Sequence, residues 1–316
     1  MNKVLIIDEV HPSMFDIFKN AGIAFDYQPD LDRAQALNCI ENYQAVILRS
    51  KILADKEFID IGKNLKAIGR TGAGMETIDI PYAESKGIAC INSPEGNRDA
   101  VGEQAIGMLL SLMNNLNKAD NEVRNKTWDR EGNRGIELNG RVVGIIGYGN
   151  MGGAFAKKLS GFDVEVIVYD KYKTNYGNQY AKEVSLQELL ERADIISLHV
   201  PQTPETIAMV NDEFLSLCKK NIILINTARG KVVKTDDLVK HLKTGHVFAA
   251  ALDVLEYESF NFQDFLTDNM PEAFNYLAKS KNVLFTPHIA GWTIESKYKL
   301  SAVLAEKIAS YLQSHK

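Results

Sequence analysis

The chain has 316 residues, which suggests about two domains and allows a large core. Its 45% hydrophobic and 24% charged residues are typical of an ordinary globular protein. The net charge of −5 provides no basic face of the kind that nucleic acid requires, so we expect no nucleic-acid partner. The three cysteines (Cys39, Cys90 and Cys218) have neither metal-ligand nor disulfide spacing, so we expect no metal.

The chain begins on an apolar run without the pattern of a signal peptide. No stretch reaches the ~18 apolar residues that a membrane span needs. We therefore expect a cytoplasmic protein that makes no contact with a membrane.

Residues 1–98 alternate between apolar runs and amphipathic stretches. The runs predict buried strands at residues 4–7, 45–48, 66–69 and 88–91, and the stretches between them, such as 12–20 and 56–63, predict helices. This alternation indicates a small α/β domain with a mostly parallel sheet.

Two of these predicted strands end in sequences that suit a ligand. Arg49 and Ser50 follow the strand predicted at 45–48. The sequence R-T-G-A-G at 70–74, which includes Ala73 and Gly74, follows the strand predicted at 66–69. In open α/β sheets ligands bind beyond the carboxyl ends of strands, where a glycine-flanked loop exposes N–H groups to an anion. Taken alone, each loop is equally well explained as a solvated turn.

The segment S-P-E-G-N at 93–97 is rich in turn residues and is a candidate hinge. Residues 100–116 then predict a long helix that is apolar over much of its circumference. Such a helix is buried in its own chain or against a partner subunit. Residues 126–138 predict an irregular connection.

Residues 141–170 contain the most informative pattern in the chain. An apolar run at 142–146 predicts a strand, G-Y-G-N-M-G at 147–152 follows it, and a helix at 154–159 leads to a second strand at 164–169. Gly147 permits the turn, Gly149 lets a pyrophosphate approach the backbone, and Gly152 lets the helix pack on the strand. Asn150 and Met151 complete a loop at a helix N-terminus, which attracts phosphate groups.

Asp170 ends the second strand, 23 residues after Gly147. Its carboxylate can accept hydrogen bonds from a ribose diol and would repel a 2′-phosphate, so the sequence favours NAD over NADP. Lys171 and Lys173 follow this acid, which leaves some tolerance of NADP open. The plainer alternative is a tight strand-to-helix turn without a cofactor.

The strand–helix alternation resumes after Asp170. We expect strands at 195–200, 222–226, 249–252 and 283–285, helices at 186–192, 212–218, 235–244 and 295–312, and a long loop or lid at 256–281.

Three residues after these strands could supply catalysis: Arg229, Glu258 and His288. A guanidinium suits a substrate carboxylate, and an imidazole can exchange a hydroxyl proton near neutral pH. A neighbouring carboxylate can orient that imidazole. From spacing alone, plainer explanations are favoured: Arg229 as a turn cap, Glu258 as a surface acid and His288 as a structural histidine.

Seven segments, in this order along the chain, together resemble the D-isomer-specific 2-hydroxyacid dehydrogenases. They are R-S at 49–50, R-T-G-A-G-M-E-T-I-D at 70–79, E-L-N-G-R-V-V-G-I-I-G-Y-G-N-M-G at 137–152, H-V-P at 199–201, N-T-A-R-G at 226–230, A-L-D-V at 251–254 and T-P-H-I-A-G at 286–291. An ordered set that spans nearly the whole chain is far more specific than any single motif.

The resemblance implies two doubly wound α/β domains: a flavodoxin-like substrate domain at 1–98, completed by 291–316, and a Rossmann NAD domain at 99–290. It also implies a homodimer or homotetramer supported by the region of the 100–116 helix.

The resemblance further implies the role of each site residue. Arg229 would bind the substrate, His288 would be the acid/base, and Glu258 would pair with it. The cofactor would be NAD, held by Gly147, Gly149, Asn150, Met151, Gly152, Asp170, His199, Val200, Pro201, Thr227, Ala228, Asp253, Ala290 and Gly291. The substrate would contact Arg49, Ser50, Ala73 and Gly74, and Arg130 or Arg134 could reach a substrate phosphate, within the chain or across a dimer.

Within the family, the segments at 70–79 and 93–104 are most similar to the phosphoglycerate dehydrogenases. This predicts oxidation of 3-phospho-D-glycerate to 3-phosphohydroxypyruvate in serine biosynthesis. The closest alternative is reduction of glyoxylate, hydroxypyruvate or another 2-keto acid. An alternative of another class is an NAD-sensing binding protein of the corepressor type, which needs no catalytic residues.

The sequence departs from the family pattern in three places. Ser259 stands after Glu258 where many relatives have proline, and Trp292 stands where a small residue is usual. The first difference bears on the geometry of the lid, and the second on the substrate pocket. The chain also stops at Lys316, so regulation through a C-terminal domain is not expected.

Overall fold

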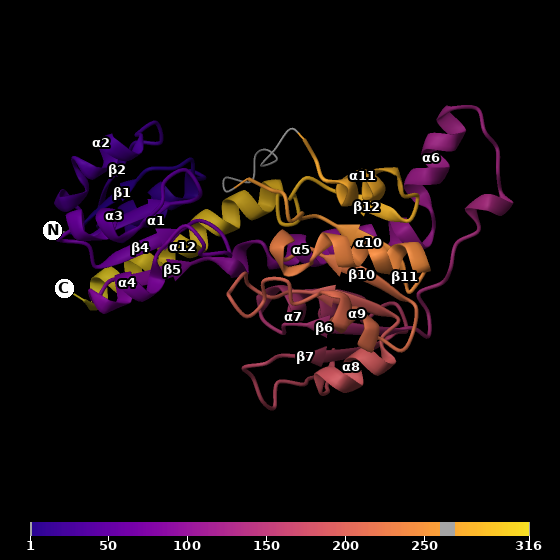
Figure 1. Ribbon diagram of the computed structural model, residues 1–316. Helices are drawn as coiled ribbons and strands as arrows, with labels where there is room; N and C mark the ends of the chain where they lie inside the picture. The colour runs from indigo at the N-terminus through magenta and orange to yellow at the C-terminus, as the bar shows by residue number, and fades with distance from the viewer. Residues whose placement is uncertain (1, 260–268, 316) are drawn as a thin grey trace. The chain divides into compact units, whose positions relative to one another are not determined.

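The computed structural model describes residues 2–259 and 269–315 (Figure 1). The chain forms two compact units. Unit 1 comprises Met1–Arg98 and Gly291–Lys316, and unit 2 comprises Asp99–Ala290. Each unit contains one parallel sheet with helices on both faces, so the predicted α/β class with two doubly wound sheets is confirmed.

The sheet of unit 1 has five parallel strands in the order β2-β1-β3-β4-β5. This is the flavodoxin-like order, with its topological switch between β1 and β3. The strands are β1 (Lys3–Ile6), β2 (Ala24–Tyr27), β3 (Ala45–Leu48), β4 (Ala67–Arg70) and β5 (Ala89–Asn92).

Helices cover both faces of this sheet, so its middle strand β3 is apolar at every position. Along β3, Val46 and Leu48 enter one core, whereas Ala45 and Ile47 enter the other. The C-terminal helix α12 contributes Leu304, Ile308 and Leu312 to the second core, beside α1. The helices of unit 1 are α1 (Ser13–Asn20), α2 (Arg33–Leu37), α3 (Lys56–Ile61), α4 (Ile80–Ser85) and α12 (Ile294–Ser314).

The sheet of unit 2 has seven parallel strands in the order β12-β11-β10-β9-β6-β7-β8. Counted from β6 along the chain, this is the Rossmann order 3-2-1-4-5-6 with one further strand, and its switch lies between β6 and β9. The strands are β6 (Val142–Ile146), β7 (Glu165–Tyr169), β8 (Lys182–Glu183), β9 (Ile195–Leu198), β10 (Ile222–Asn226), β11 (Val247–Leu252) and β12 (Val283–Phe285).

Two hydrophobic cores lie on the two faces of this second sheet. Figure 1 shows α8, α9 and α10 among the helices around it. The helices of unit 2 are α5 (Arg98–Met113), α6 (Leu116–Arg124), α7 (Asn150–Leu159), α8 (Leu186–Arg192), α9 (Asp212–Leu217), α10 (Thr235–Thr244) and α11 (Glu272–Lys279).

Several elements differ from the sequence-based expectation. The helix predicted at 100–116 ends at Met113, and Asn115, at φ 53°, breaks the path before α6 begins. The sequence of α6 is polar and none of its residues is buried, so it lacks an apolar stripe to predict it from. The strands β2 and β8 and the helices α2 and α4 are short and were also not predicted.

The segment predicted as a long loop at 256–281 contains α11, so that prediction was wrong for residues 272–279. The helix is amphipathic, and it buries Ala273 and Leu277 against the core beside α10. Residues 260–268, which are part of the predicted lid, lie outside the described residues. Across residues 2–259 and 269–315, no helix is long and apolar enough to span a membrane.

Candidate active site

The glycine motif occupies the switch point of the unit 2 sheet. Gly147 follows β6 at φ 93°, and a Cβ built on it would lie 2.5 Å from the carbonyl oxygen of His199, after β9. A Cβ on Gly152 would lie 2.1 Å from the carbonyl oxygen of Gly147. A Cβ on Gly149, in contrast, would have no described atom within 4 Å. The loop is therefore tight at its two ends and open in its middle, which fits a pyrophosphate approaching Gly149.

The helix α7 starts directly after this loop with Gly149 at its N-cap. Among the described residues, no side chain caps it. The N-terminal turn is therefore suited to bind a phosphate group through backbone N–H groups and the helix dipole.

Asp170 follows β7 and borders the same loop. Its carboxylate accepts hydrogen bonds from the backbone N–H groups of Tyr148 (2.9 Å) and Tyr172 (3.0 Å). Lys173 donates to the carbonyl oxygen of Tyr148 (2.6 Å), and Lys171 pairs with Glu205 (2.8 Å). Both lysines thus have protein partners, while the carboxylate is held beside the glycine loop, where a ribose diol would meet it.

Two polar atoms at the carboxyl ends of β9 and β10 have no hydrogen-bond partner in the described part of the chain. They are Nδ1 of His199 and Oγ1 of Thr227, and both are buried. The other ring nitrogen of His199 contacts the Ser197 hydroxyl at 2.9 Å, and burial lowers the pKa of His199 to about 4. Buried polar atoms without partners are uncommon, and a bound ligand at this edge would be placed to satisfy them.

His288 and Glu258 form a close pair. The Nδ1 atom of His288 lies 2.8 Å from Oε2 of Glu258, and the two side chains are 21% and 18% exposed. The second oxygen of Glu258 accepts the backbone N–H of Leu255, which fixes the carboxylate. The pair combines an imidazole with a carboxylate that orients it, as general acid–base catalysis requires.

Asp253 holds the loop that carries His288. Its carboxylate, 1% exposed, accepts hydrogen bonds from the Thr286 hydroxyl (2.5 Å) and from the N–H groups of Ile289 and Ala290 (both 2.9 Å). Its carbonyl oxygen accepts the N–H of His288 (2.7 Å). His288 has φ 52°, an unusual conformation for a non-glycine residue, and these bonds stabilise it. The sequence predicted Asp253 only as a cofactor neighbour and missed this bracing role.

Arg229 lies in the turn after β10, next to the strand that leads to Asp253 and Glu258. Its guanidinium donates to the carbonyl oxygen of Ala228 (2.6 Å), and its own carbonyl accepts from the Asn226 side chain (3.0 Å). A Cβ on Gly230 would lie 1.9 Å from the carbonyl oxygen of Leu255. The loops after β10 and β11 are therefore packed together, and β12 next to them leads to His288.

Polar residues also gather at the carboxyl ends of the unit 1 strands. Arg49 and Ser50 follow β3, and the N–H of Arg49 donates to the Asp8 carboxylate (2.6 Å). Ala73, next to Gly74, accepts a bond from Asn92 at the end of β5 (2.6 Å). The hydroxyls of Thr71 and Ser93, at the ends of β4 and β5, are buried and have no partner in the described residues.

Residues 106–290 match the family model described as "D-isomer specific 2-hydroxyacid dehydrogenase, NAD binding domain". The chain belongs to the D-isomer specific 2-hydroxyacid dehydrogenase family. This confirms the resemblance predicted from the sequence, and with it NAD as the cofactor.

Individual relatives cover nearly the whole chain. It is 34% identical to the D-3-phosphoglycerate dehydrogenase of Archaeoglobus fulgidus over 98% of its own length and 57% of that protein. It is 37% identical to the glyoxylate reductase of Thermofilum pendens over 91% of its length and 83% of that protein. A D-lactate dehydrogenase from Aquifex aeolicus, solved with NAD and lactic acid, superposes with a TM-score of 0.81 at 28% identity, over 99% of this chain and 96% of that one. The chain thus spans little more than half of the phosphoglycerate dehydrogenase relative.

The 2-hydroxyacid dehydrogenase fold separates Arg130 and Arg134 from the other predicted site residues of unit 2. Both precede β6, whereas the glycine loop, Glu258 and His288 follow the carboxyl ends of strands. Arg134 forms an exposed ion pair with Glu131 (2.8 Å). Both arginines thus lie in the connection that joins α6 to β6.

Proposed function

We propose that the chain is an NAD-dependent oxidoreductase that interconverts a D-2-hydroxy acid and its 2-keto acid. The observation that carries this proposal is the 2.8 Å pair of His288 and Glu258, on the segments after β12 and β11, beside the strand β10 that ends at Arg229. Substrate-binding by unit 1 and assembly into a homodimer or homotetramer are parts of the same proposal.

Each residue has a role that its surroundings support. Arg229 would bind the substrate carboxylate through the paired N–H groups of its guanidinium. His288 would take the hydroxyl proton through Nε2, because Nδ1 is engaged by Glu258. Glu258 would stabilise the imidazolium that forms, and Asp253 would hold the loop in place. The glycine loop and Asp170 would hold NAD, which supplies hydride acceptance and donation when it is bound.

For the substrate, we propose 3-phospho-D-glycerate, oxidised to 3-phosphohydroxypyruvate in serine biosynthesis. The relative at 34% identity supports this choice, as do the segments at 70–79 and 93–104. A specific observation favours a second candidate, a glyoxylate or hydroxypyruvate reductase. The relatives with those names match 83% and 88% of their own lengths.

The test is NADH absorbance with a panel of acids. The forward reaction would be assayed with 3-phosphoglycerate, D-lactate, D-glycerate and 2-hydroxyglutarate, and the reverse reaction with hydroxypyruvate and glyoxylate. We expect a strong preference for 3-phosphoglycerate. Turnover of the unphosphorylated keto acids alone would support the proposed reaction but would reject 3-phospho-D-glycerate as the substrate. Binding of NADH without any turnover would favour the sensing protein and reject the enzyme.

A further inference from the structure

The residue Trp292 contacts the one arginine that follows β3. The Arg49 guanidinium carbon lies 4.2 Å from the centroid of the Trp292 ring, within the range of a cation–π contact. Both residues belong to unit 1.

Arg49 lies at the topological switch point of the unit 1 sheet. It follows β3, and its N–H donates to Asp8, two residues after the end of the neighbouring strand β1. Its carbonyl oxygen accepts from the Arg70 side chain and the Thr77 hydroxyl, both at 3.3 Å. The backbone of Arg49 is therefore fixed on both sides, at the place where open α/β sheets bind ligands.

The charge of Arg49 is poorly compensated by the protein. In the described residues its guanidinium has no hydrogen-bond or ion-pair partner, because Asp8 accepts the backbone N–H instead. Burial lowers the pKa of the Arg49 guanidinium, against the opposing charges of Asp8 and Glu9. A half-buried arginine whose N–H groups have no protein partner is suited to bind an oxyanion.

The backbone of Trp292 is fixed as firmly as that of Arg49. Thr293 and Ser296 form a capping box at the start of α12, with bonds of 3.0 and 2.9 Å. The Ser296 hydroxyl also donates to the carbonyl oxygen of Gly291 (2.6 Å), and Gly291 itself has φ 91°. Trp292 therefore projects from a rigid turn, although its side chain is 63% exposed.

We propose that Trp292 is a positioning residue for the substrate acid: its indole face holds the Arg49 guanidinium flat and leaves the N–H edges open to the carboxylate or phosphate ester. A guanidinium stacked on an aromatic ring keeps all its donors in one plane, so its fork stays available for two parallel hydrogen bonds. A small residue at position 292 would leave the long arginine side chain free to rotate. This inference rests on the proposed function.

The test compares Trp292→Phe, which keeps an aromatic face, with Trp292→Leu, which keeps an apolar side chain without one. The readout is the Kd for 3-phosphoglycerate with NADH, and for hydroxypyruvate, whose C2 carries no hydrogen, with NAD, measured by calorimetry on the full chain. These pairs cannot react, so the Kd is independent of turnover. Inorganic phosphate is a third probe. Arg49→Ala is the reference for loss of the anion site, and Ile294→Ala, at a neighbouring position that is 89% exposed, is the matched control.

We expect Trp292→Leu to weaken acid binding about tenfold and Trp292→Phe to stay within about threefold of the wild type. Arg49→Ala should lose about 100-fold. NADH affinity, the unfolding temperature and the Ile294→Ala values should not change. In turnover assays, KM should rise about tenfold in Trp292→Leu while kcat changes less than about twofold.

Three results would overturn the inference: wild-type affinity in Trp292→Leu, equal losses in the Phe and Leu variants, or no anion binding by the wild type. A failure of the proposed function is a different result, namely a wild type that binds an acid but turns over none of them. The Kd series tests the role of Trp292 in that case as well.

Discussion

His288 depends on its neighbours for its geometry. Its backbone is in the left-handed region, its N–H is bonded to Asp253, and its ring is bonded to Glu258. The histidine and the glutamate could be predicted from the sequence, because they match a family segment and a family spacing. The role of Asp253 could not be predicted from the sequence, because a buried carboxylate that accepts three hydrogen bonds is recognised only when its donors are seen.

We expect His288→Asn to lower kcat by about 10² to 10⁴-fold, the usual contribution of a general acid–base. Glu258→Gln should lower kcat less, because it retains a hydrogen-bonding group but removes the charge that stabilises the imidazolium. The measurement is steady-state kinetics with the best acid of the panel. Glu213→Gln, an exposed carboxylate on α9, is the control and should not change kcat. An unchanged kcat in His288→Asn would contradict the assignment.

His199 provides a prediction for the pH dependence of stability. Burial lowers its pKa to about 4, below the ~6.5 of an unfolded chain. Between these values the unfolded state binds the proton and the folded state does not, so stability is complete above about pH 6.5 and falls as the pH drops towards 4. The loss is at most about 3 kcal/mol.

The check is the urea midpoint at pH 7.5 and pH 5 for the wild type and for His199→Gln. The difference between the two pH values should be smaller in the variant. The same pH difference in both proteins would show that His199 is not the group responsible.

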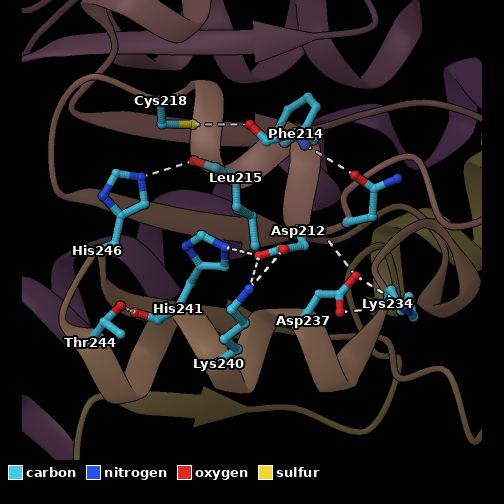
Figure 2. Close-up of polar contacts among 11 residues, drawn as sticks. Asp212, Phe214, Leu215, Cys218, Lys234, Asp237, Lys240, His241, Thr244 and His246 are labelled. Carbon is cyan, nitrogen blue, oxygen red and sulfur yellow. Dashed lines mark hydrogen bonds and ion pairs between the residues drawn. The ribbon is translucent and has the colours of Figure 1, made fainter.

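At the scale of elements, α9 and α10 are joined by a polar cluster away from the glycine loop. Figure 2 shows Lys240 and His241 reaching from α10 to Asp212 at the start of α9. His241 lies 2.8 Å from the Asp212 carboxylate and is 7% exposed, and Lys240 lies 2.7 Å from it. Bonds from Lys240 and His241 lower the pKa of Asp212.

We expect His241→Ala to lower the free energy of unfolding by about 1–3 kcal/mol, because it removes a buried ring as well as a hydrogen bond. Lys240→Ala removes an exposed partner of the same carboxylate and should cost less than about 1 kcal/mol. Chemical denaturation measures both, and kcat should be unchanged in each. Equal losses in the two variants would contradict the argument from burial.

The burial of each element explains whether it could be predicted from the sequence. The central strands β3, β6, β9 and β10 are almost entirely apolar because helices cover both faces of each sheet, so their sequences are distinctive. The edge strands β2 and β8 and the exposed helix α6 bury little, so no apolar pattern marks them. The helix α11 is amphipathic, but its eight residues were included in the long loop predicted at 256–281.

At the scale of the whole molecule, we expect NAD binding to stabilise the fold. A ligand at about 100 times its Kd contributes about 2.7 kcal/mol, or about 5–10 °C in the apparent unfolding temperature. Gly149→Ala should abolish this shift without unfolding the protein, since its Cβ would meet no described atom within 4 Å and would instead occupy the path of the pyrophosphate.

The matched control is Gly153→Ala. Its Cβ also meets nothing within 4 Å among the described atoms, but it lies one turn into α7. This variant should keep the full shift with NAD. If Gly149→Ala keeps the shift as well, the glycine loop does not bind the cofactor.

The sequence alone determined the fold class, the family and the cofactor. A glycine motif between two strands and an ordered set of segments are local patterns, so they can be recognised without a structure. Only the tertiary structure decided how the candidate residues meet. It brought Asp253 under the His288 loop and placed the Arg49 guanidinium over the Trp292 ring. The physical reason is that contacts between residues far apart in the chain depend on strand order, which no local pattern encodes.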